Sequence, residues 1–336
     1  MNLNDFTYDL PEDLIAQYPL MQRDQARLLI VDRSQKILTH DVFSNIGQYL
    51  PSKSCIVLND SKVMPARLLG KKEKSGGGVE IFLLKKLSDG YSYEALLRPL
   101  KKIKTNDRII LNGSGIVAKI VDKDHRIVRF NTRNLTTFLN KIGHMPLPPY
   151  IKRKDEALDR KFYQTVYARE WGSVASPTAG LHFTKPLLDQ LVKKGHTIKK
   201  LTLHINYGTF QPVEEQDITR HKMFSEDYAV AKRTFDNIKK DKENGLKVVA
   251  IGSTSCRVLE AVSRNGIFKG STNIFIYPGF QFRLVDCLVT NFHLPFSTLL
   301  MLVYAFGTME LMKQAYSEAV KNRYRFYSYG DCMLIL

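Results

Sequence analysis

The sequence predicts an α/β protein, with an α/β domain interrupted by an inserted small all-β barrel domain. Three observations support this prediction. Helix-like and strand-like segments alternate after about residue 160, which is typical of an α/β layer with parallel strands. Short β-rich runs separated by turns fill residues 67–143, and the stiff connector H-M-P-L-P-P-Y (144–150) follows them. We therefore expect the α/β domain to comprise residues 1–66 and 144–336, and the barrel domain to comprise residues 67–143.

The segment before the insertion is expected to begin with a short helix and to continue with strands. R-L-L-I-V-D (27–32) and K-I-L-T-H (36–40) are rich in apolar and β-branched residues and flank a polar turn. C-I-V-L-N-D (55–60) is typical of a buried strand that ends in polar residues. These three runs are expected to belong to the α/β domain.

The inserted segment consists of short runs with strand character. They are V-E-I-F-L-L, Y-S-Y-E-A-L-L, R-I-I-L, G-I-V-A-K-I-V and R-I-V-R-F. Turn sequences such as S-D-G, N-G-S-G and D-K-D-H separate them. Strands at this spacing predict a small sandwich or barrel.

The segment after residue 160 alternates between the two kinds of element. Residues 184–195 have a Thr cap, an early Pro and a closing Gly, which predict a helix. T-I-K-K-L-T-L-H-I is expected to be a strand, residues 232–244 a polar helix, and residues 247–252 a buried strand. C-R-V-L-E-A-V-S is expected to form the next helix and residues 272–277 another strand.

The composition indicates a globular protein with an acidic partner. The chain has 336 residues and a formal net charge of +17, an excess that favours a polyanion, and nucleic acid before anionic lipid. The basic residues lie in short scattered clusters rather than in one tail, so a folded surface is expected to make the contact. A chain from a generally basic proteome would show the same excess.

The termini and cysteines bear on location and cofactors. The start M-N-L-N-D-F shows no signal-peptide pattern, and the longest apolar run, residues 299–306, is too short to span a bilayer. We expect a cytoplasmic protein and a monomer. Zinc is not expected, because no cysteines have C-x-x-C spacing; buried free thiols are expected at Cys55, Cys256, Cys287 and Cys332.

Reactive residues stand in loops that follow expected strands, where α/β proteins usually place their sites. His182 lies in A-S-P-T-A-G-L-H-F-T (175–184), just before a helix capped by Thr184. The positive end of that helix favours a neutral imidazole, which can accept a proton. The alternative is a packing histidine between Leu181 and Phe183. Asp60 and Arg67 flank another such loop, where Asp60 can instead cap a turn and Arg67 lie on the surface.

Two further loops carry candidate binding residues. A-I-G-S-T-S-C-R-V-L-E (250–260) is a strand, a Gly turn with three hydroxyls and a helix, which can bind an anion or form an ordinary capped turn. D-C-L-V-T-N-F-H-L-P (286–295) places His293 after a strand and before a helix. The histidines lack metal-binding spacing, so no metal is expected.

The chain resembles the queuosine-pathway family of S-adenosylmethionine:tRNA ribosyltransferase-isomerases along essentially its whole length. The segments that carry the resemblance include N-D-S-K-V-M-P-A-R-L, G-H-M-P-L-P-P-Y-I, G-S-V-A-S-P-T-A-G-L-H-F-T, G-S-T-S-C-R-V-L-E, T-N-F-H-L-P-F-S-T-L-L-M-L-V and Y-R-F-Y-S-Y-G-D-C-M-L-I. The family's fold, an α/β domain with an inserted β-barrel, agrees with the prediction above.

The resemblance implies a reaction and its partners. S-adenosylmethionine is the ribosyl donor, and the acceptor is 7-aminomethyl-7-deazaguanine at the wobble position, in the anticodon stem-loop of certain tRNAs. The products are epoxyqueuosine in tRNA, adenine and methionine. The reaction needs a general base, a general acid for departing adenine, and close positioning, so S-adenosylmethionine is a co-substrate, and no metal or redox cofactor is expected.

The resemblance also suggests roles for the candidate residues. His182, His293 and Asp60 are the predicted catalytic residues, with the two histidines as the acid–base pair and their order open. The predicted substrate-binding residues are Arg67, Thr178, Gly180, Ser253, Thr254, Arg257 and Asn291. The chain departs from the family pattern at Gln211, Phe224 and Phe296, where Arg, His and Lys are usual, so contacts at these three positions are not carried over.

Two other classes of function compete with the ribosyl transfer. A non-catalytic basic RNA-binding protein would use the same lysine clusters and strands. A methyltransferase of the common Gly-rich type is disfavoured, because the Gly-rich strand-to-helix turn expected early in that fold is missing.

Overall fold

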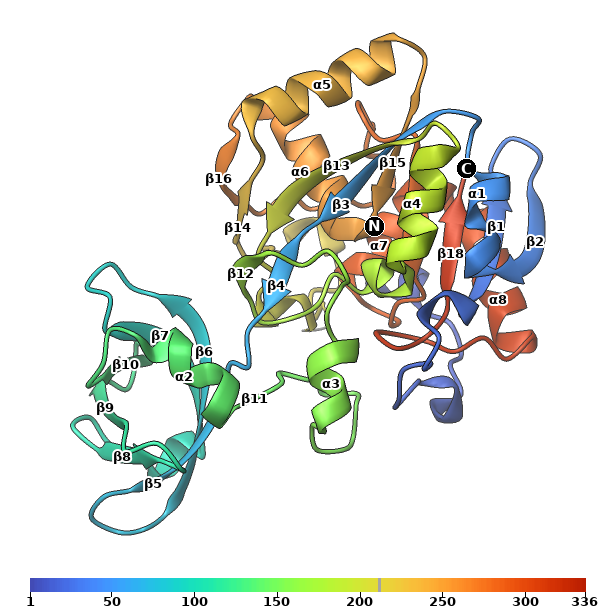
Figure 1. Ribbon diagram of the computed structural model, residues 1–336. Helices are drawn as coiled ribbons and strands as arrows, with labels where there is room; N and C mark the ends of the chain where they lie inside the picture. The colour runs from blue at the N-terminus through green and yellow to red at the C-terminus, as the bar shows by residue number, and fades with distance from the viewer. Residues whose placement is uncertain (211–212) are drawn as a thin grey trace.

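The protein, described from a computed structural model over residues 1–210 and 213–336, has two parts that the ribbon separates clearly (Figure 1). A large α/β part contains both termini, and a barrel projects from it, connected by the chain entering β5 (Arg67–Lys72) and the chain leaving β11 (Gly143–His144). The predicted fold class, an α/β domain interrupted by an all-β barrel, is confirmed. The boundaries at residues 66/67 and 143/144 stay a prediction.

The α/β part is built on a nine-stranded sheet in the order β16-β14-β13-β3-β15-β17-β18-β1-β2. The strands are β1 (Arg27–Asp32), β2 (Ile37–Val42), β3 (Ser54–Asn59), β13 (Thr197–Leu203), β14 (Glu226–Ala229), β15 (Lys247–Ile251), β16 (Lys269–Thr272), β17 (Cys287–Asn291) and β18 (Cys332–Ile335). A separate short pair joins β4 (Ser61–Val63) to β12 (Glu170–Ser173).

The sheet is mixed rather than wholly parallel. The four central strands β13, β3, β15 and β17 are parallel to one another, as predicted. The outer strands β14 and β16 pair antiparallel on one side, and β18 pairs antiparallel to β17 on the other. The parallel centre is buried on both faces, which is why its strands are continuously apolar in sequence.

Helices cover both faces of this sheet. They are α1 (Ile46–Tyr49), α4 (Lys185–Lys193), α5 (Lys232–Glu243), α6 (Gly252–Asn265), α7 (Thr298–Gly307) and α8 (Met309–Lys321). In β3, Cys55 and Val57 pack with the cluster that includes α5 to α8, whereas Ile56 and Leu58 pack with α1 and α4. The alternation of side chains along one strand therefore separates two cores.

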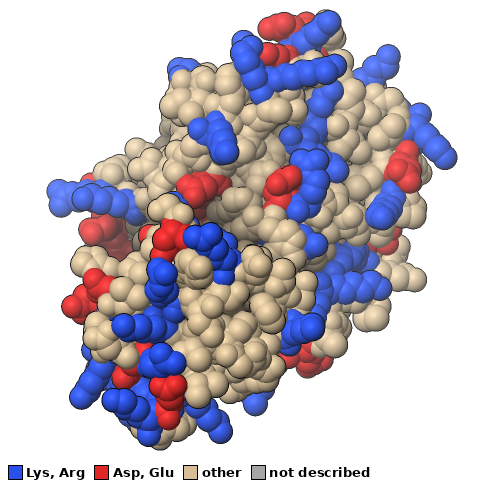
Figure 2. Space-filling model, turned by 60° about the vertical axis from the view of Figure 1, so that its left-hand side comes forward, with Lys and Arg blue, Asp and Glu red and all other residues tan. Residues whose placement is uncertain are grey.

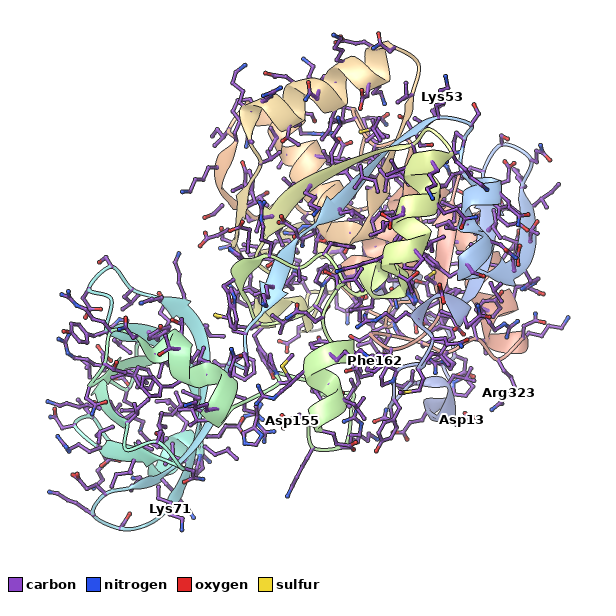
Figure 3. All side chains as sticks on the ribbon, viewed as in Figure 1. Asp13, Lys53, Lys71, Asp155, Phe162 and Arg323 are labelled. Atoms are coloured by element: carbon purple, nitrogen blue, oxygen red, sulfur yellow. The ribbon has the colours of Figure 1, made fainter. Side chains whose placement is uncertain are left out.

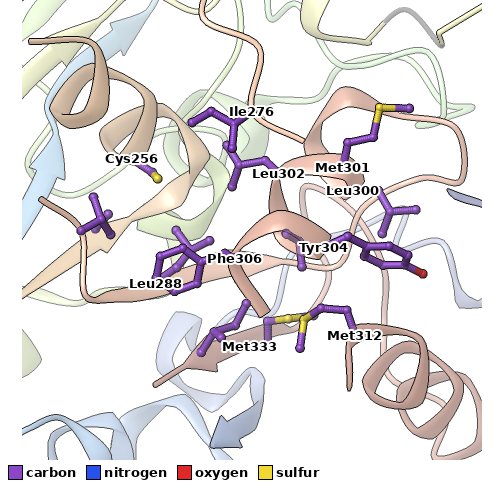
Figure 4. Packing of buried hydrophobic residues seen from close by; sticks show 14 of the residues in the cluster. Cys256, Ile276, Leu288, Leu300, Met301, Leu302, Tyr304, Phe306, Met312 and Met333 are labelled. Carbon is purple, nitrogen blue, oxygen red and sulfur yellow. The ribbon is translucent and has the colours of Figure 1, made fainter. Parts of the chain in front are cut away.

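The larger core surrounds α7. Leu300, Met301, Leu302 and Tyr304 of this helix are all buried and contact residues of α6, β17 and α8 (Figure 4). A helix that is apolar around its whole circumference belongs in such a position. All four cysteines are free and buried, as predicted.

The barrel closes through β5. Its strands are β5 (Arg67–Lys72), β6 (Gly78–Lys86), β7 (Ser92–Arg98), β8 (Arg108–Leu111), β9 (Val117–Asp122) and β10 (Ile127–Phe130), and β5 pairs with both β6 and β8. Strand β11 (Gly143–His144) extends the sheet beside β5, and α2 (Leu135–Ile142) packs against the barrel core. Helix α3 (Ala157–Phe162) follows the connector (Figure 1).

The short helix expected at the start of the chain takes the form of three short 3₁₀ helices, at Leu3–Phe6, Glu12–Leu14 and Arg23–Gln25. One expectation about local structure was wrong. The strand expected at residues 272–277 ends at Thr272. There the Ile274 backbone bonds to side chains, since its N–H donates to Thr272 Oγ1 and its carbonyl accepts from Arg257 Nε. Side chains thus replace the strand ladder as hydrogen-bond partners.

Candidate active site

A cavity lies at the carboxyl ends of β15 and β17, two adjacent parallel strands. This is the edge where α/β sheets bind their ligands. Its wall is built from residues 175–179, from the start of α6, from the loop between β17 and α7, and from the side chains of Tyr150, Tyr327 and Ser328. The cavity therefore combines segments that are far apart in the sequence.

The start of α6 gives the cavity a partly positive wall. Gly252 has a φ of +85°, so the chain turns sharply out of β15 where a side chain would strain the backbone. Ile251 occupies the N-cap position and offers no side-chain cap, so the first N–H groups of the helix lack that partner. The uncapped N–H groups and the helix dipole favour a negatively charged group there.

Hydroxyl groups line the same region. Ser253 lies on the cavity wall, and its hydroxyl makes no hydrogen bond within residues 1–210 and 213–336. The hydroxyls of Ser176, Thr254 and Tyr327 are buried beside the cavity and also lack a partner in the described structure. Buried polar groups are normally satisfied, so this concentration points to a polar ligand.

His293 contributes the imidazole that lines this cavity. Its Nε2 atom lies 2.7 Å from Thr290 Oγ1, and its backbone N–H donates to the Tyr316 hydroxyl at 3.1 Å. Burial lowers the pKa of His293 to about 3. The ring is therefore neutral at pH 7 and held in a fixed position.

His182 lies behind the cavity wall rather than in it. It is the last residue of the 3₁₀ helix Thr178–His182, packs against Phe43 with 5.1 Å between ring centroids, and lines a small neighbouring cavity with Arg325. Its Nε2 atom is 3.4 Å from Oδ1 of Asn291, which does line the main cavity. Asn291 thus connects His182 to the main cavity.

The neutral form of the His182 imidazole has a different cause from the one predicted. Its pKa is lowered to about 4 chiefly by burial, and the positive charges of Arg325 and Arg23 lower it further. The predicted helix does begin nearby, with Thr184 accepting a hydrogen bond from the Leu187 N–H. The ring is neutral, as expected, because it is desolvated.

Tyr150 links the cavity to the connector that leads from the barrel. Its ring stacks on Tyr327 with centroids 4.4 Å apart and an angle of 20° between planes. Its hydroxyl is 2.6 Å from Ser328 Oγ. A residue of the inter-domain connector is therefore part of the cavity wall.

The structure brings together Thr178, Ser253, Thr254, Asn291 and His293 from the predicted set, since all five line the main cavity. It does not bring the remaining predicted residues to that wall. Gly180 packs against Tyr167, whose hydroxyl would clash with any side chain there. Their roles in binding and catalysis stay predictions.

Three predicted charged residues have protein partners elsewhere. Asp60 is buried, accepts a hydrogen bond from Thr202 Oγ1 at 2.7 Å, and has a pKa raised by burial. Arg67 pairs with Glu80 at 2.8 Å beside a second cavity. Arg257 forms a buried ion pair with Glu226. Since each is tied to its neighbours outside the main cavity, contact with a ligand there is not supported.

Two residues that depart from the family pattern, Phe224 and Phe296, also lie outside the main cavity. Phe224 is 51% exposed, and its ring covers Gly208. Phe296 has a φ of +60°, and its N–H donates to the Phe6 carbonyl. Gln211 falls outside the described residues.

Several cavity residues were not predicted from the sequence. Tyr150, Ser176, Tyr327 and Ser328 lie within or beside quoted motifs, H-M-P-L-P-P-Y, A-S-P-T-A-G and Y-R-F-Y-S-Y-G. The accumulation of polar and aromatic residues within those motifs was the available signal. Among the described residues, no group of three His, Cys, Asp or Glu side chains could hold a metal ion, and no helix is long and apolar enough to cross a membrane.

The mixed sheet, the inserted barrel and the cavity at the strand ends define an α/β protein with a two-part architecture. Comparison with known proteins identifies the family to which the chain belongs. Residues 3–335 match the family described as Queuosine biosynthesis protein, and this chain belongs to that family.

Named relatives cover the entire chain. It is 48% identical over 337 residues to the S-adenosylmethionine:tRNA ribosyltransferase-isomerase of Sulfurihydrogenibium sp. and 47% identical over 343 residues to that of Acetivibrio thermocellus, with 100% of each protein covered in both comparisons. The crystal structure of S-adenosylmethionine tRNA ribosyltransferase from Thermotoga maritima has a TM-score of 0.57 and 36% identity, covering 99% of this chain and 100% of that one. The predicted family and the prediction of a transferase are confirmed.

Proposed function

We propose that this protein transfers and isomerises the ribosyl group of S-adenosylmethionine onto 7-aminomethyl-7-deazaguanine at the wobble position of tRNA. The products are epoxyqueuosine-tRNA, adenine and methionine. Family membership and the names of full-length relatives support this reaction and not the non-catalytic RNA-binding alternative. The structural observation that carries the proposal is the cavity in which an uncapped helix start faces a neutral imidazole.

The donor is expected to place its methionine carboxylate at the start of α6. The first N–H groups of α6 attract a carboxylate, and the hydroxyls of Ser253, Thr254 and Thr178 supply further hydrogen-bond partners on the same wall. Tyr150 and Tyr327 present stacked aromatic rings to the cavity, which suits the planar part of a nucleoside. The cavity thus offers separate places for the two ends of the donor.

His293 is the residue that we assign to proton transfer. The sulfonium acidifies the neighbouring 5′ carbon, and a neutral imidazole can accept the proton that leaves it. Because burial lowers the pKa of His293, the protonated ring gives its proton up readily, as departing adenine requires. His182 acts as a positioning residue, through its contact with Asn291, and the order of the proton transfers is left open.

One assay tests this function. The protein is incubated with S-adenosylmethionine and tRNA carrying the aminomethyl base, and the small products are identified by mass spectrometry. Adenine together with methionine supports ribosyl transfer. S-adenosylhomocysteine would indicate methylation instead, and the absence of any product would leave only RNA binding.

We further propose that the protein works as a cytoplasmic monomer on the anticodon stem-loop. The excess of basic residues, with a formal net charge of +17, supports an RNA partner. Light scattering after size-exclusion chromatography, with and without the stem-loop, tests the monomer and the stoichiometry. A stable dimer in the absence of RNA would contradict the proposal.

A further inference from the structure

A second cavity, of about 380 Å³, lies between the barrel and the connector. Its volume is within the range of pockets that hold small ligands. Arg67, Phe82 and Arg98 line it from the barrel strands, and residues 147–149 and 151–155 line it from the connector and the segment after it. Asp155 marks the place in Figure 3, where the chain passes between the barrel and α3.

The charge of this cavity is positive. Five Arg or Lys residues and two carboxylates line it. Both carboxylates are already paired, Glu80 with Arg67 at 2.8 Å and Asp155 with His144 at 2.9 Å. Arg98 and Lys154 have no ion-pair partner within the described part of the chain. These two cations are therefore available to an anionic group.

Aromatic and proline rings provide flat apolar surfaces beside these cations. Tyr207, in the 3₁₀ turn Tyr207–Phe210, meets Phe82 of β6 at 5.3 Å between ring centroids, with 66° between the planes. The Arg98 guanidinium lies 3.5 Å from the Tyr207 hydroxyl. Pro148 and Pro149 complete the wall. Aromatic faces combined with Arg and Lys recognise unpaired nucleotides through base stacking and phosphate contacts.

The connector places this cavity next to the main one. The side chain of Tyr150 lines the main cavity, whereas its neighbours Pro149 and Ile151 line the second. Consecutive residues of one turn, in which the Ile151 N–H donates to the Pro148 carbonyl at 3.0 Å, thus form a partition between the two cavities. Consecutive unpaired nucleotides of an RNA loop are able to occupy both sides of such a partition. Basic side chains are spread over both parts of the protein on the face shown in Figure 2, so the surrounding surface also suits RNA.

We propose that the second cavity binds an unpaired nucleotide of the RNA substrate, flanking the nucleotide that enters the main cavity. The base stacks on Tyr207, and Arg98 and Lys154 contact its phosphate. This inference rests on the proposed function, since it takes tRNA to be the substrate. The second cavity then supplies affinity and selects the nucleotide next to the modified base.

Equilibrium binding of a fluorescently labelled anticodon stem-loop tests the inference. Tyr207→Ala removes the stacking surface and is expected to weaken binding roughly tenfold or more, whereas Tyr207→Phe keeps the ring and should bind nearly as the unmodified protein does. Arg98→Gln should weaken binding and reduce the slope of log affinity against log salt by about one. Arg233→Gln, an exposed arginine on α5, is the matched control and should leave both quantities unchanged.

Unchanged affinity in both Tyr207→Ala and Arg98→Gln would overturn the inference. If Tyr207→Ala fails to fold, as its thermal melting would show, Arg98→Gln decides alone, because Arg98 is exposed. Adenine release by the unmodified protein is measured separately. No adenine release would refute the proposed function, while the binding comparison still decides whether this cavity contacts RNA.

Discussion

Replacement of Ser253 by Ala tests the donor site with little risk to the fold. The Ser253 hydroxyl lies on the cavity wall and makes no hydrogen bond in the described structure, so its removal breaks no contact within the protein. The substitution is therefore expected to leave the free energy of unfolding almost unchanged. Any loss of donor affinity can then be attributed to the missing hydroxyl.

The size of that loss follows from the ligand group that we place there. A hydrogen bond to a charged group contributes about 1.5–3 kcal/mol, and about 1.4 kcal/mol corresponds to a tenfold change in affinity. Ser253→Ala should therefore weaken S-adenosylmethionine binding roughly ten- to hundredfold, as measured by isothermal titration calorimetry.

Ser255 provides the matched control. It lies two residues further along α6, and its hydroxyl is also buried and without a partner in the described structure, but it does not line the cavity. Ser255→Ala should bind the donor as tightly as the unmodified protein does. Equal donor affinities of the Ser253→Ala, Ser255→Ala and unmodified proteins would refute the placement of the carboxylate.

Three further predictions concern the histidines and the RNA. His293→Ala should reduce turnover roughly a hundredfold or more, which is the usual contribution of an acid–base group. The reduction should be larger than that caused by His182→Ala. A larger effect of His182→Ala in steady-state assays would reverse the roles assigned to the two histidines. In the native protein, His182 and His293 stay neutral down to pH values of about 4 and 3, whereas unfolded histidine binds a proton near pH 6.5. The free energy of unfolding should therefore fall as the pH drops from 6.5 toward 4, by up to about 1.4 kcal/mol per pH unit for each residue. Urea unfolding at pH 7 and pH 5 should show a smaller decrease for His293→Asn, and an equal decrease would contradict the burial argument. The affinity for the stem-loop should decline steeply with salt, and a flat response in anisotropy titrations would remove the electrostatic basis for RNA binding.

Much of the fold could be predicted because the sequence pattern and the tertiary environment agree. Residues 184–195 carry a cap, an early Pro and a closing Gly, and α4 occupies residues 185–193 with Thr184 as its cap. The five runs predicted as barrel strands are short and separated by turns, and all five correspond to strands, β6 to β10. Residues 272–277 have strand composition, but Thr272 and Arg257 satisfy the backbone there through their side chains, and such a contact has no local signature.

The candidate site was predictable in its loops more than in its individual residues. The strands that precede Ser253, Thr254 and His293 end at one edge of the sheet. The strand-to-helix turns that follow these strands are recognisable in the sequence, so the loops of the site could be predicted. The sequence does not show which way a side chain points, so His182 was expected in the cavity that Asn291 lines. Tyr150 reaches that cavity only because the chain returns from the barrel beside it.

The central claim is that S-adenosylmethionine occupies the cavity at the carboxyl ends of β15 and β17. A crystal structure of the protein with the donor bound measures this directly. We predict the methionine carboxylate at the first N–H groups of α6, within hydrogen-bond distance of Ser253, and the sulfonium end toward His293. Donor density in the cavity between the barrel and the connector, with the cavity beside α6 empty, would contradict the account.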